Sequence, residues 1–530
     1  MRLGLLALLV LAAGVRWLMW SRTVTLFNDG PEFLAIARAA AAGDYGTVLA
    51  HPFHPLYPLL VAALHGAGIE WETAAALIGV AGGTAAVGFL FLFFRDAFGV
   101  SAAWIGAGLV AVQSRAVEYS SDIQSDGLYL GLFAAGVYFG WRAWTRRSLG
   151  HAMAAGLASG LAYLTRPEGL GLACVLVGLA FVEALRGSWR VAPALRWATG
   201  MAVAALLCVA PYSVALQRYS GEWSLTTKKS IGDLVGVAPD AAERPAEARV
   251  RPARSPLYAP VSPAVSANRL QLDSGEDGLA VEQAATKPRR AFAAARMLAR
   301  TEKSAFRYGA LLLFVPGLFF SRGRPTRRAV YVAAIAGAYT VVLFGLTYSS
   351  GYVSHRHALP PLLPLYGYVG LGAIALGTWI ARAAERRDLR GLRRASPLVI
   401  AAAIAALVGI GELATQREPR RANERAARSA AEWLGEHGDP GPLATTRLRL
   451  GYYAGMPYVP LIVVDDPNLA PQVDRYLEET GVRYVLLDDP EQVEAIRRIE
   501  GARLQPLHSV REGGREAWVF ERVATPGAGR

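Results

Sequence analysis

The stretch Phe27-Asn28-Asp29-Gly30-Pro31-Glu32-Phe33 follows closely on the first apolar segment of the chain, Leu3–Trp20. An apolar segment of that length matches the roughly 20 residues that a helix needs to cross a bilayer core. Arg16, Trp17 and Trp20 are typical interface anchors, and no small-x-small cleavage motif follows them, which favours a retained spanning helix over a signal peptide. The two carboxylates of the quoted stretch therefore lie where the chain leaves the membrane.

The composition of the whole chain is that of a membrane protein. Its 530 residues are 53% hydrophobic and 18% charged, and the mean hydropathy is +0.27. The apolar residues fall into blocks of roughly 17–25, which is the spanning length. The sequence predicts about eleven spanning helices, near residues 3–20, 73–94, 101–117, 126–144, 150–164, 168–186, 194–216, 304–321, 328–348, 358–381 and 396–414.

The arginines predict how these helices are oriented. The formal net charge is +13, but the basic residues gather in short loops between apolar blocks, which indicates membrane orientation rather than nucleic-acid binding. With a cytoplasmic N-terminus, one side of the membrane receives Arg95, Arg146, Arg147, Arg186, Arg190, Arg322, Arg324, Arg327, Arg328, Arg382, Arg386, Arg387, Arg390, Arg393 and Arg394. The other side receives Asp29, Glu32, Glu118, Asp122, Asp126, Glu168 and His355. We therefore expect a multi-pass membrane protein. Arginine greatly outnumbers lysine, and alanine and glycine are abundant, which is typical of a GC-rich bacterial genome and indicates a bacterial inner membrane.

The predicted fold is mostly α, a polytopic membrane protein with a small C-terminal α/β domain outside the cytoplasm. Residues 1–414 form the predicted membrane domain, with a first outer loop at 21–72 and a large outer loop at 218–303 that contains a helix near 281–300. Residues 415–530 form the α/β domain. Its strand-like runs are 441–446, 459–465 and 482–488, and its helical patterns lie near 421–436, 468–480 and 490–499.

The acidic pair Asp29 and Glu32 allows two interpretations. An Asp followed three residues later by a Glu is a capping box, and Pro31 suits the first turn of a helix. Alternatively, Asp29 points into a cavity and acts as a general base, which requires hydrogen-bond reach of the proton it takes. Both interpretations hold together if Glu32 caps and Asp29 catalyses.

A second dense patch, His51-Pro52-Phe53-His54-Pro55-Leu56-Tyr57-Pro58, lies about twenty residues further on. Turn formation or interface packing is the simpler explanation for His51 and His54. Two histidines near carboxylates also suit a divalent metal. Cys174 and Cys208 both lie inside apolar blocks, which argues against a disulfide framework and against a thiolate metal site.

Three acids, Glu118, Asp122 and Asp126, recur every four residues at the outer mouth of two predicted spans. On a continuous helix they would share one face, where like charges repel unless they serve a cation, a polar substrate or a titration. Acids at membrane depth are functional candidates, although a solvated loop face is the simpler explanation.

Basic residues on the predicted outer side could meet an anion. Arg166 and Glu168 lie in a short turn, where they either pair with each other or leave Arg166 to bind a phosphate. Arg356 lies between His355 and His357, and its guanidinium matches phosphate oxygens. Tyr352 precedes this group, and Lys228 and Lys229 lie on the same predicted side.

Together these motifs resemble those of the polyprenyl-phosphate-dependent GT-C glycosyltransferases. The resemblance is to the branch (family 39) of bacterial relatives of the protein O-mannosyltransferases and of the lipid A aminoarabinose transferase. It covers roughly residues 1–380 and is carried by 28–32, 51–58, 125–127, 165–169 and 355–360. The tail departs from the protein O-mannosyltransferases, because it lacks further spanning helices.

The resemblance implies an inverting transfer of a sugar from a polyprenyl-phosphate donor to an acceptor hydroxyl outside the cytoplasm. Asp29 corresponds to the base and Arg356 to the basic residue near the lipid phosphate. The predicted catalytic residues are Asp29, Glu32 and Asp126. The predicted substrate-binding residues are His51, His54, Tyr57, Glu118, Asp122, Arg166, Glu168, Tyr352, His355, Arg356 and His357.

The predicted partners are the lipid donor, the bilayer and an acceptor that is a protein, a lipid or a glycan, with no nucleic acid. No cofactor is required, because arginines can meet the charge of a monophosphate, but a divalent metal is allowed. Two other functions compete with this prediction. One is a transporter or flippase of a lipid-linked or anionic substrate, which predicts charges in mid-helix and symmetry between halves. The other is a non-catalytic scaffold that uses the tail.

Overall fold

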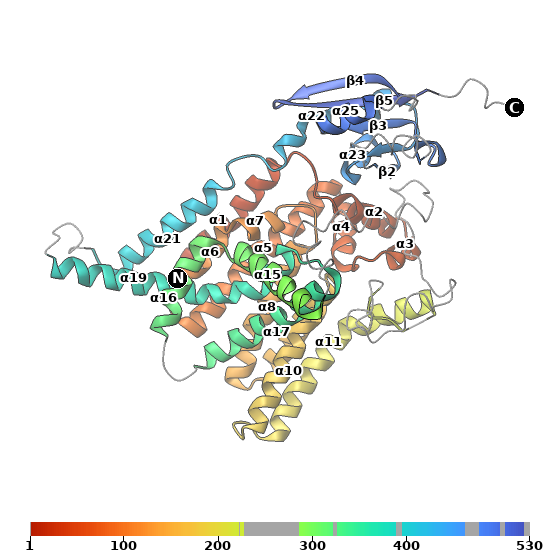
Figure 1. Cartoon of the computed structure of the whole chain (residues 1–530). Coiled ribbons are helices and arrows are strands. Elements are labelled where there is room, and N and C mark those ends of the chain that lie inside the picture. Colours follow the sequence, from red (N-terminus) through yellow and green to blue (C-terminus); the bar gives the residue numbers. More distant parts are fainter. Residues whose placement is uncertain are drawn as a thin grey trace. The chain divides into compact units, whose positions relative to one another are not determined.

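The computed structural model describes residues 2–221, 223–226, 286–321, 326–387, 395–461, 476–498 and 504–523 (Figure 1). Helices dominate the described chain, as the sequence predicts. All the predicted apolar blocks are helical. A helix satisfies the hydrogen bonds of its own backbone, which lipid cannot do. The corresponding elements are α1 (Arg2–Ser21), α5 (Trp71–Phe98), α6 (Val100–Val112), α7 (Ser114–Ser120), α8 (Asp126–Arg146), α9 (Leu149–Tyr163), α10 (Leu170–Leu185), α11 (Val191–Ser220), α16 (Tyr308–Phe320), α17 (Arg327–Ser350), α19 (Tyr366–Arg386) and α21 (Pro397–Ala414).

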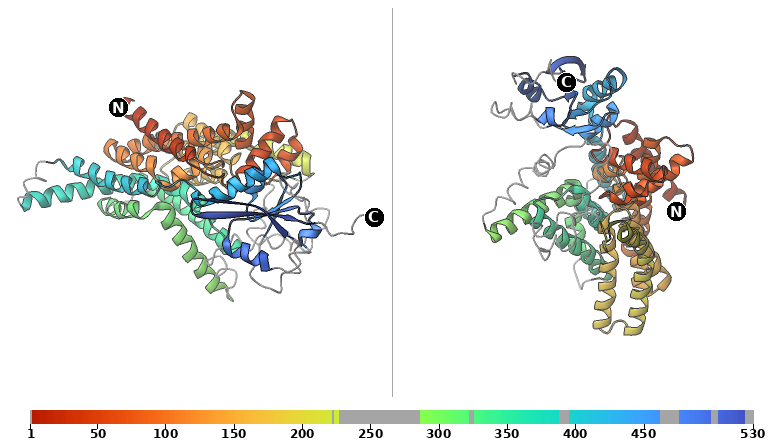
Figure 2. Two further views of the ribbon diagram at one scale, coloured as in Figure 1. Left: turned by 90° about the horizontal axis from the view of Figure 1, so that it is seen from above. Right: turned by 90° about the vertical axis from the view of Figure 1, so that its right-hand side faces the viewer.

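Several of these helices are long and apolar enough to cross a membrane. Within the described residues, seven satisfy that test alone, and an eighth span results if α6 and α7 count as one. The seven are Arg2–Ser21, Trp71–Phe98, Pro167–Leu185, Val191–Ser220, Arg327–Ser350, His355–Arg386 and Pro397–Ala414. The chain is therefore a multi-pass membrane protein. α10 and α11 run side by side in Figure 1 and in the right-hand view of Figure 2.

The predicted span at 101–117 is broken rather than continuous. α6 and α7 meet at an angle of 56°. A break inside a membrane frees backbone groups that must find other partners. Gln416 Nε2 donates to Val112 O at 3.0 Å, and Ser114 N donates to Glu412 Oε2 at 2.9 Å. Buried Arg16 donates to Ala111 O at 3.0 Å.

Glycines hold α5 against α8. A side chain at Gly127 would place its Cβ 2.5 Å from the carbonyl oxygen of Gly79, and one at Gly131 would lie 2.6 Å from that of Gly82. Only residues without a Cβ allow two backbones to approach so closely, which is a recurrent feature of helix pairs in membranes. The contact fixes the start of α8, and Asp126 is its first residue.

Contacts divide the described chain into two compact units. The first unit contains the described parts of 2–20, 52–226 and 286–417. The second unit contains 21–51 together with the described parts of 418–523. Residues 21–51, part of the predicted first outer loop, thus belong to the same unit as the C-terminal residues. The sequence-based division at residues 414 and 415 remains a prediction about domains.

The first unit also contains the short or amphipathic helices that lie between the spans. They are α4 (Leu56–Gly66), the 3₁₀ turn η1 (Pro167–Gly169), α15 (Lys287–Phe306), α18 (His355–Leu362) and the turn η4 (Leu363–Leu365). α15 occupies the position near 281–300 where the sequence predicts a helix. The predicted loop residues 227–285, including Lys228 and Lys229, lie outside the described residues, as do Arg322, Arg324, Arg390, Arg393 and Arg394.

The second unit carries a five-stranded sheet in the order β2-β1-β3-β5-β4. β1 (Leu443–Thr445) is parallel to β2 (Tyr458–Pro460) and β3 (Tyr484–Leu487), while β4 (Leu504–Glu512) and β5 (Arg515–Arg522) are antiparallel. Gly513 and Gly514 join β4 to β5 with φ of 59° and 74°. Such left-handed angles suit a two-residue hairpin turn and favour glycine. The predicted α/β tail is confirmed.

Helices cover both faces of this sheet. Along β3, Tyr484 and Leu486 pack with α22 (Arg425–His437) and α23 (Leu448–Ala454), while Val485 and Leu487 pack with α25 (Pro490–Arg498). This alternation follows the period of two in a strand, and all four side chains are buried. The same unit contains α2 (Gly30–Ala41), α3 (Tyr45–Ala50) and the turn η5 (Ala422–Glu424). Most of the predicted helix at 468–480 lies outside the described residues.

Candidate functional site

The start of α8 and the turn after α9 form a buried ion pair. Arg166 Nη1 bonds to Asp126 Oδ1, and the two residues are 9% and 3% exposed. Asp126 is the first residue of α8, where the helix dipole favours a negative charge. The pair joins two elements that are 40 residues apart in the sequence. The predicted alternative pairing of Arg166 with Glu168 is present but longer, at 3.7 Å.

Two further residues extend this pair toward α18. Glu168 Oε1 lies 3.8 Å from Nε2 of His357, and Tyr339 of α17 donates its hydroxyl to the carbonyl oxygen of Glu168 at 2.8 Å. The ring of Tyr352 meets that of His357 edge to face at 6.0 Å. Four sequence-predicted residues, Asp126, Arg166, Glu168 and His357, therefore belong to one polar cluster. We name it the outer cluster, after the side of the membrane on which the sequence predicts these residues to lie.

The groups around Arg166 have opposite effects on its pKa. Burial disfavours its charge, but the carboxylates of Asp126 and Glu168 prevail and raise the pKa of Arg166 above its ordinary value. The positive charge of Arg356 acts in the opposite direction. Arg356 follows His355 at the start of α18, so α18 brings a second guanidinium toward the outer cluster. Two guanidiniums and an imidazole beside two carboxylates suit an anionic substrate.

Glu118, Asp122 and Asp126 do not share one helix face, and this prediction is wrong. α7 ends at Ser120 and α8 begins at Asp126. Ser121 Oγ bonds back to Val117 O at 2.7 Å, which lets the serine side chain compete with the helical ladder. Glu118 accepts from Arg115 at 2.7 Å, and buried Asp122 accepts from the amide of Ile123 at 2.9 Å. Each of the three acids therefore bonds to a different partner, and they form no common acidic face.

The histidine patch is divided between the two units. His54 is buried in the first unit, where its ring lies 4.9 Å from that of Tyr163 and 5.3 Å from that of Tyr212. Tyr57 is fully buried and donates to Ala75 O at 3.1 Å, which anchors α4 on α5. Both residues are packed inside this unit, and their assignment to substrate binding stays a prediction. The contacts of His51 lie in the second unit.

The capping-box interpretation of the Asp29 motif is not what the structure contains. Asp29 occupies the N-cap position of α2, with Pro31 in the first turn, but its side chain accepts no capping hydrogen bond. The side chain of Glu32 instead bonds through Oε2 to Nε2 of His51. Asp29 is half-buried, and His51 is buried. The motif thus separates into a residue at the helix start and a carboxylate–imidazole pair.

The described residues contain no group of three or more His, Cys, Asp or Glu side chains that could hold a metal ion. Whether the chain uses a divalent metal stays an untested prediction.

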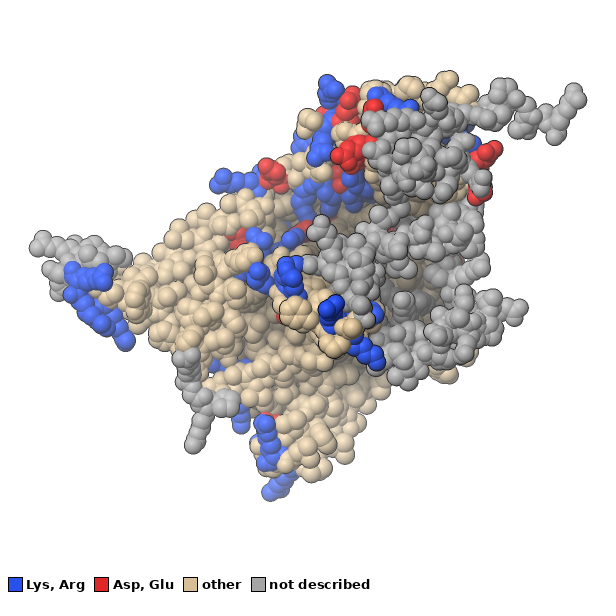
Figure 3. Space-filling model, viewed as in Figure 1, with Lys and Arg blue, Asp and Glu red and all other residues tan. Residues whose placement is uncertain are grey.

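One cationic surface was not predicted. Arg289, Arg296, Arg300 and Lys303 are exposed and recur at intervals that place them on one face of α15. We name this the α15 basic face, and Lys and Arg side chains gather over α15 in Figure 3. The helix leads through Arg307 into apolar α16. The periodicity of charge over 287–303 could have revealed this face in the sequence.

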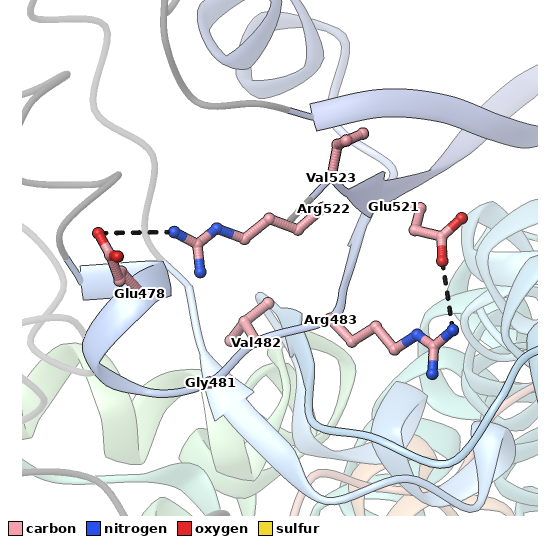
Figure 4. A pocket seen from close by; sticks show the side chains of 7 residues that line it. All are labelled: Glu478, Gly481, Val482, Arg483, Glu521, Arg522 and Val523. Atoms are coloured by element: carbon pink, nitrogen blue, oxygen red, sulfur yellow. Dashed lines mark ion pairs between the residues drawn. The ribbon is translucent and has the colours of Figure 1, made fainter. Parts of the chain in front are cut away.

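The second unit also contains a cavity of about 560 Å³ beside the ends of β3 and β5 (Figure 4). Its charged lining is paired, since Arg522 lies 3.8 Å from Glu478 and Arg483 lies 3.5 Å from Glu521. None of the sequence-predicted site residues lines this cavity. The outer cluster and the Asp29 region, which contain such residues, therefore remain the candidate sites.

Comparison with known proteins agrees with this fold. Residues 50–214 match the family model described as dolichyl-phosphate-mannose-protein mannosyltransferase. That range includes His51, His54, Asp126 and Arg166. No curated protein matches the chain by sequence.

Solved structures match over most of the chain. ArnT from Cupriavidus metallidurans bound to undecaprenyl phosphate is 15% identical, with 98% of both chains covered and a TM-score of 0.56. ArnT from the same organism in the apo state is 16% identical, with the same coverage of both chains and a TM-score of 0.55. The apo oligosaccharyltransferase of Archaeoglobus fulgidus is 14% identical, with 91% of this chain and 69% of that chain covered and a TM-score of 0.55. The chain therefore has the GT-C fold that the sequence resemblance implies.

Proposed function

We propose that this protein is an integral-membrane glycosyltransferase that moves a sugar from a polyprenyl-phosphate donor to an acceptor hydroxyl outside the cytoplasm. The observation that carries the proposal is the outer cluster, where Arg166 and Arg356 gather at the ends of apolar helices beside Glu168 and His357. Guanidiniums suit the phosphate of a lipid donor, and apolar helices suit its prenyl chain. A related fold is known with undecaprenyl phosphate bound.

In this proposal the sugar transfers by a single inverting displacement. The acceptor oxygen attacks the anomeric carbon, a new glycosidic C–O bond forms, and the bond between that carbon and the phosphate oxygen breaks. The acceptor proton passes to Asp29, and the polyprenyl phosphate leaves with both bonding electrons. Arg356, together with Arg166, stabilises the charge of the leaving phosphate.

Asp29 is a better candidate base than Asp126. Asp126 is buried in an ion pair with Arg166, so its carboxylate is already held by a structural partner. Asp29 is half-buried at the start of α2 and is not used as a helix cap. The pair of Glu32 and His51 would orient polar groups beside it. The catalytic assignment of Asp126 stays an untested prediction.

The α15 basic face supports the same kind of donor. Four cations on one exposed face attract lipid phosphates at a membrane surface. We propose that this face helps to recruit the anionic donor, and that the protein lies in a bacterial inner membrane with its N-terminus in the cytoplasm. The sugar and the acceptor are left open.

The test is a transfer assay in proteoliposomes with radiolabelled polyprenyl-phosphate sugars, comparing the wild type with Asp29→Asn. The asparagine keeps the size of the side chain but cannot take the proton, so transfer should fall by about 10²–10⁴-fold. Glu436→Gln, an exposed acid on α22, is the matched control. Full activity in Asp29→Asn would contradict the assignment of the base. Movement of lipid between leaflets without label transfer would favour a transporter.

A further inference from the structure

The segment before Asp29 is bonded to the C-terminal part of the chain through four backbone groups of residues 24–26. Residues 24–26 lie in the second unit, and Thr25 and Leu26 are both 1% exposed. The hydrogen bonds run from Val24 N to Arg420 O (3.1 Å), from Arg421 Nε to Thr25 O (2.7 Å), from Leu26 N to Tyr453 OH (3.0 Å) and from Arg428 Nη1 to Val24 O. A loop bound in this way has little local freedom.

A buried carboxylate lies at the centre of this attachment. Thr25 Oγ1 donates to Glu424 Oε2 at 2.7 Å. Arg449 donates to both oxygens of Glu424, from Nε at 2.8 Å and from Nη2 at 2.6 Å. Arg447 Nε lies 3.7 Å from the same carboxylate and also donates to Asp488 at 2.5 Å. Two-point recognition of a carboxylate by arginine fixes its direction as well as its charge.

The electrostatics of Glu424 agree with this geometry. Burial alone would raise its pKa, but the hydrogen bond and charge of Arg449, with further help from Thr25 and Arg447, hold the pKa below its ordinary value. Glu424 is 4% exposed and Arg449 is 9% exposed. A buried carboxylate that accepts hydrogen bonds from two arginine nitrogens and from the Thr25 hydroxyl is an attachment point rather than a solvated surface charge.

The attachment continues beyond Leu26 into α2. Arg38 of α2 lies over the ring of Tyr452 at 5.6 Å, and α2 packs against α23. Asp29 therefore stands between two points that are fixed to the same part of the chain, residues 24–26 on one side and α2 on the other. Its backbone position depends on residues 420–453 at both of these points.

We propose that Glu424 is a positioning residue for the transfer reaction, because through Thr25 it fixes the segment that presents Asp29 and so makes the C-terminal domain part of the catalytic machinery. This inference rests on the proposed function. Glu424 acts through Thr25 and Asp29 rather than on the substrate. Its loss should therefore lower kcat and leave the KM for the donor, whose phosphate is assigned to other residues, nearly unchanged.

The test uses two pairs of variants in the full-length protein. Glu424→Gln is compared with Glu436→Gln, which removes an exposed acid near the end of α22. Thr25→Val, which keeps the shape but loses the hydroxyl, is compared with Thr25→Ser, which keeps the hydroxyl. The measurements are kcat and donor KM in proteoliposomes, and hydrogen exchange at the amides of Val24 and Leu26.

Glu424→Gln and Thr25→Val should exchange these amides faster and lose about 10²-fold in kcat, as expected for a misplaced catalytic group. Glu436→Gln and Thr25→Ser should behave like the wild type. Wild-type kcat in both attachment variants, with faster exchange, overturns the positioning role but leaves the proposed function intact. A rise in donor KM alone also overturns it. A wild type without transfer, whatever its exchange pattern, ends the proposed function and this role together.

Discussion

Glu32 and His51 bond side chain to side chain across 19 residues of sequence, joining the first turn of α2 to the residue that ends α3. Both lie in the second unit. A carboxylate bonded to one ring nitrogen of a histidine fixes the orientation of the ring and the tautomer of the other nitrogen. The pair thus closes the α2–α3 segment on itself, one turn after Asp29.

We expect Glu32→Gln and His51→Gln to lower transfer by similar factors of about 10²-fold, because each removes the same oriented pair. The double variant should be little worse than either single one, since a pair that acts as a unit shows an interaction free energy of about 0.5–3 kcal/mol. Steady-state kinetics of the three variants measure this. Factors that simply multiply in the double variant would mean that the two residues act independently.

Breaking the ion pair of Asp126 and Arg166 should destabilise the first unit. Asp126→Asn leaves Arg166 only its longer pairing with Glu168, and Arg166→Gln removes the guanidinium that neutralises buried Asp126; breaking a buried pair in this way costs about 3–5 kcal/mol. Thermal unfolding in detergent should show a clear fall in Tm for each. The double variant Asp126→Leu/Arg166→Leu should recover part of that loss, because no charge then remains buried without a partner. A double variant less stable than both singles would argue against this explanation.

The glycine contact between α5 and α8 gives a steric prediction. Gly127→Ala forces a Cβ to within 2.5 Å of Gly79 O, so the two backbones must separate. We expect a loss of about 1–3 kcal/mol in stability, measured by thermal unfolding. Gly108→Ala is the control, because its Cβ would meet nothing within 4 Å. Equal effects of the two substitutions would show that helix propensity, and not the contact, sets the loss.

The buried carboxylate of Glu424 gives a pH prediction. Its pKa in the folded protein lies below the ordinary value of 4.5. The ionised group therefore stabilises the fold at pH values above 4.5, and this contribution disappears as the pH falls through the lowered pKa. Limited proteolysis between residues 21 and 29 should start at a higher pH in Glu424→Gln than in the wild type. The same onset in both proteins would remove Glu424 from the acid response.

The α15 basic face predicts a salt-sensitive donor interaction. Each cation near a membrane surface contributes about 1 kcal/mol toward an anionic lipid, so Arg289→Gln/Arg296→Gln should weaken binding of polyprenyl phosphate by about tenfold or more. The matched control is Arg186→Gln/Arg190→Gln, which removes two charges from the loop between α10 and α11. The binding of each double variant to vesicles that contain polyprenyl phosphate is measured at two salt concentrations. Only the α15 double variant should bind more weakly than the wild type, and the difference should shrink at the higher salt concentration. An equal loss in both double variants would mean that the effect is not specific to α15.

The features that the sequence predicts well are those that depend on local composition. Each apolar block becomes a helix because the membrane leaves its backbone no other partner. The alternation of short strands and helices after residue 440 likewise predicts the α/β tail. The resemblance to GT-C proteins rests on short motifs and is confirmed at the level of the fold.

The features that the sequence predicts poorly depend on remote partners. The break at Gln113 is stable because Gln416 and Glu412, some 300 residues later, bond its backbone. Likewise, Glu32 matches a capping box in sequence, but His51 offers it a better partner than the helix start does. Motif spacing carries no information about such competitors.

The candidate site also combines features that local sequence predicts with features that depend on remote partners. Arg166 and Glu168 were identified in one motif and His357 in another, and the fold brings the two motifs together. The involvement of Glu424 could not be inferred, because an acid in a tail of mixed charge has no distinguishing pattern. The α15 basic face was within reach of sequence reasoning, since its charges follow the helical period.

The bond between Thr25 and Glu424 spans 399 residues, which has a consequence for how the protein is made. At typical synthesis rates of about 5–20 residues per second, residues 24–26 leave the ribosome roughly 20–80 seconds before their partners exist. During that interval the spanning helices can insert, but the segment that presents Asp29 has nothing to hold it. The segment that presents Asp29 can therefore become ordered only after the chain is complete. A protein truncated before residue 418 would be inserted in the membrane with this segment unordered.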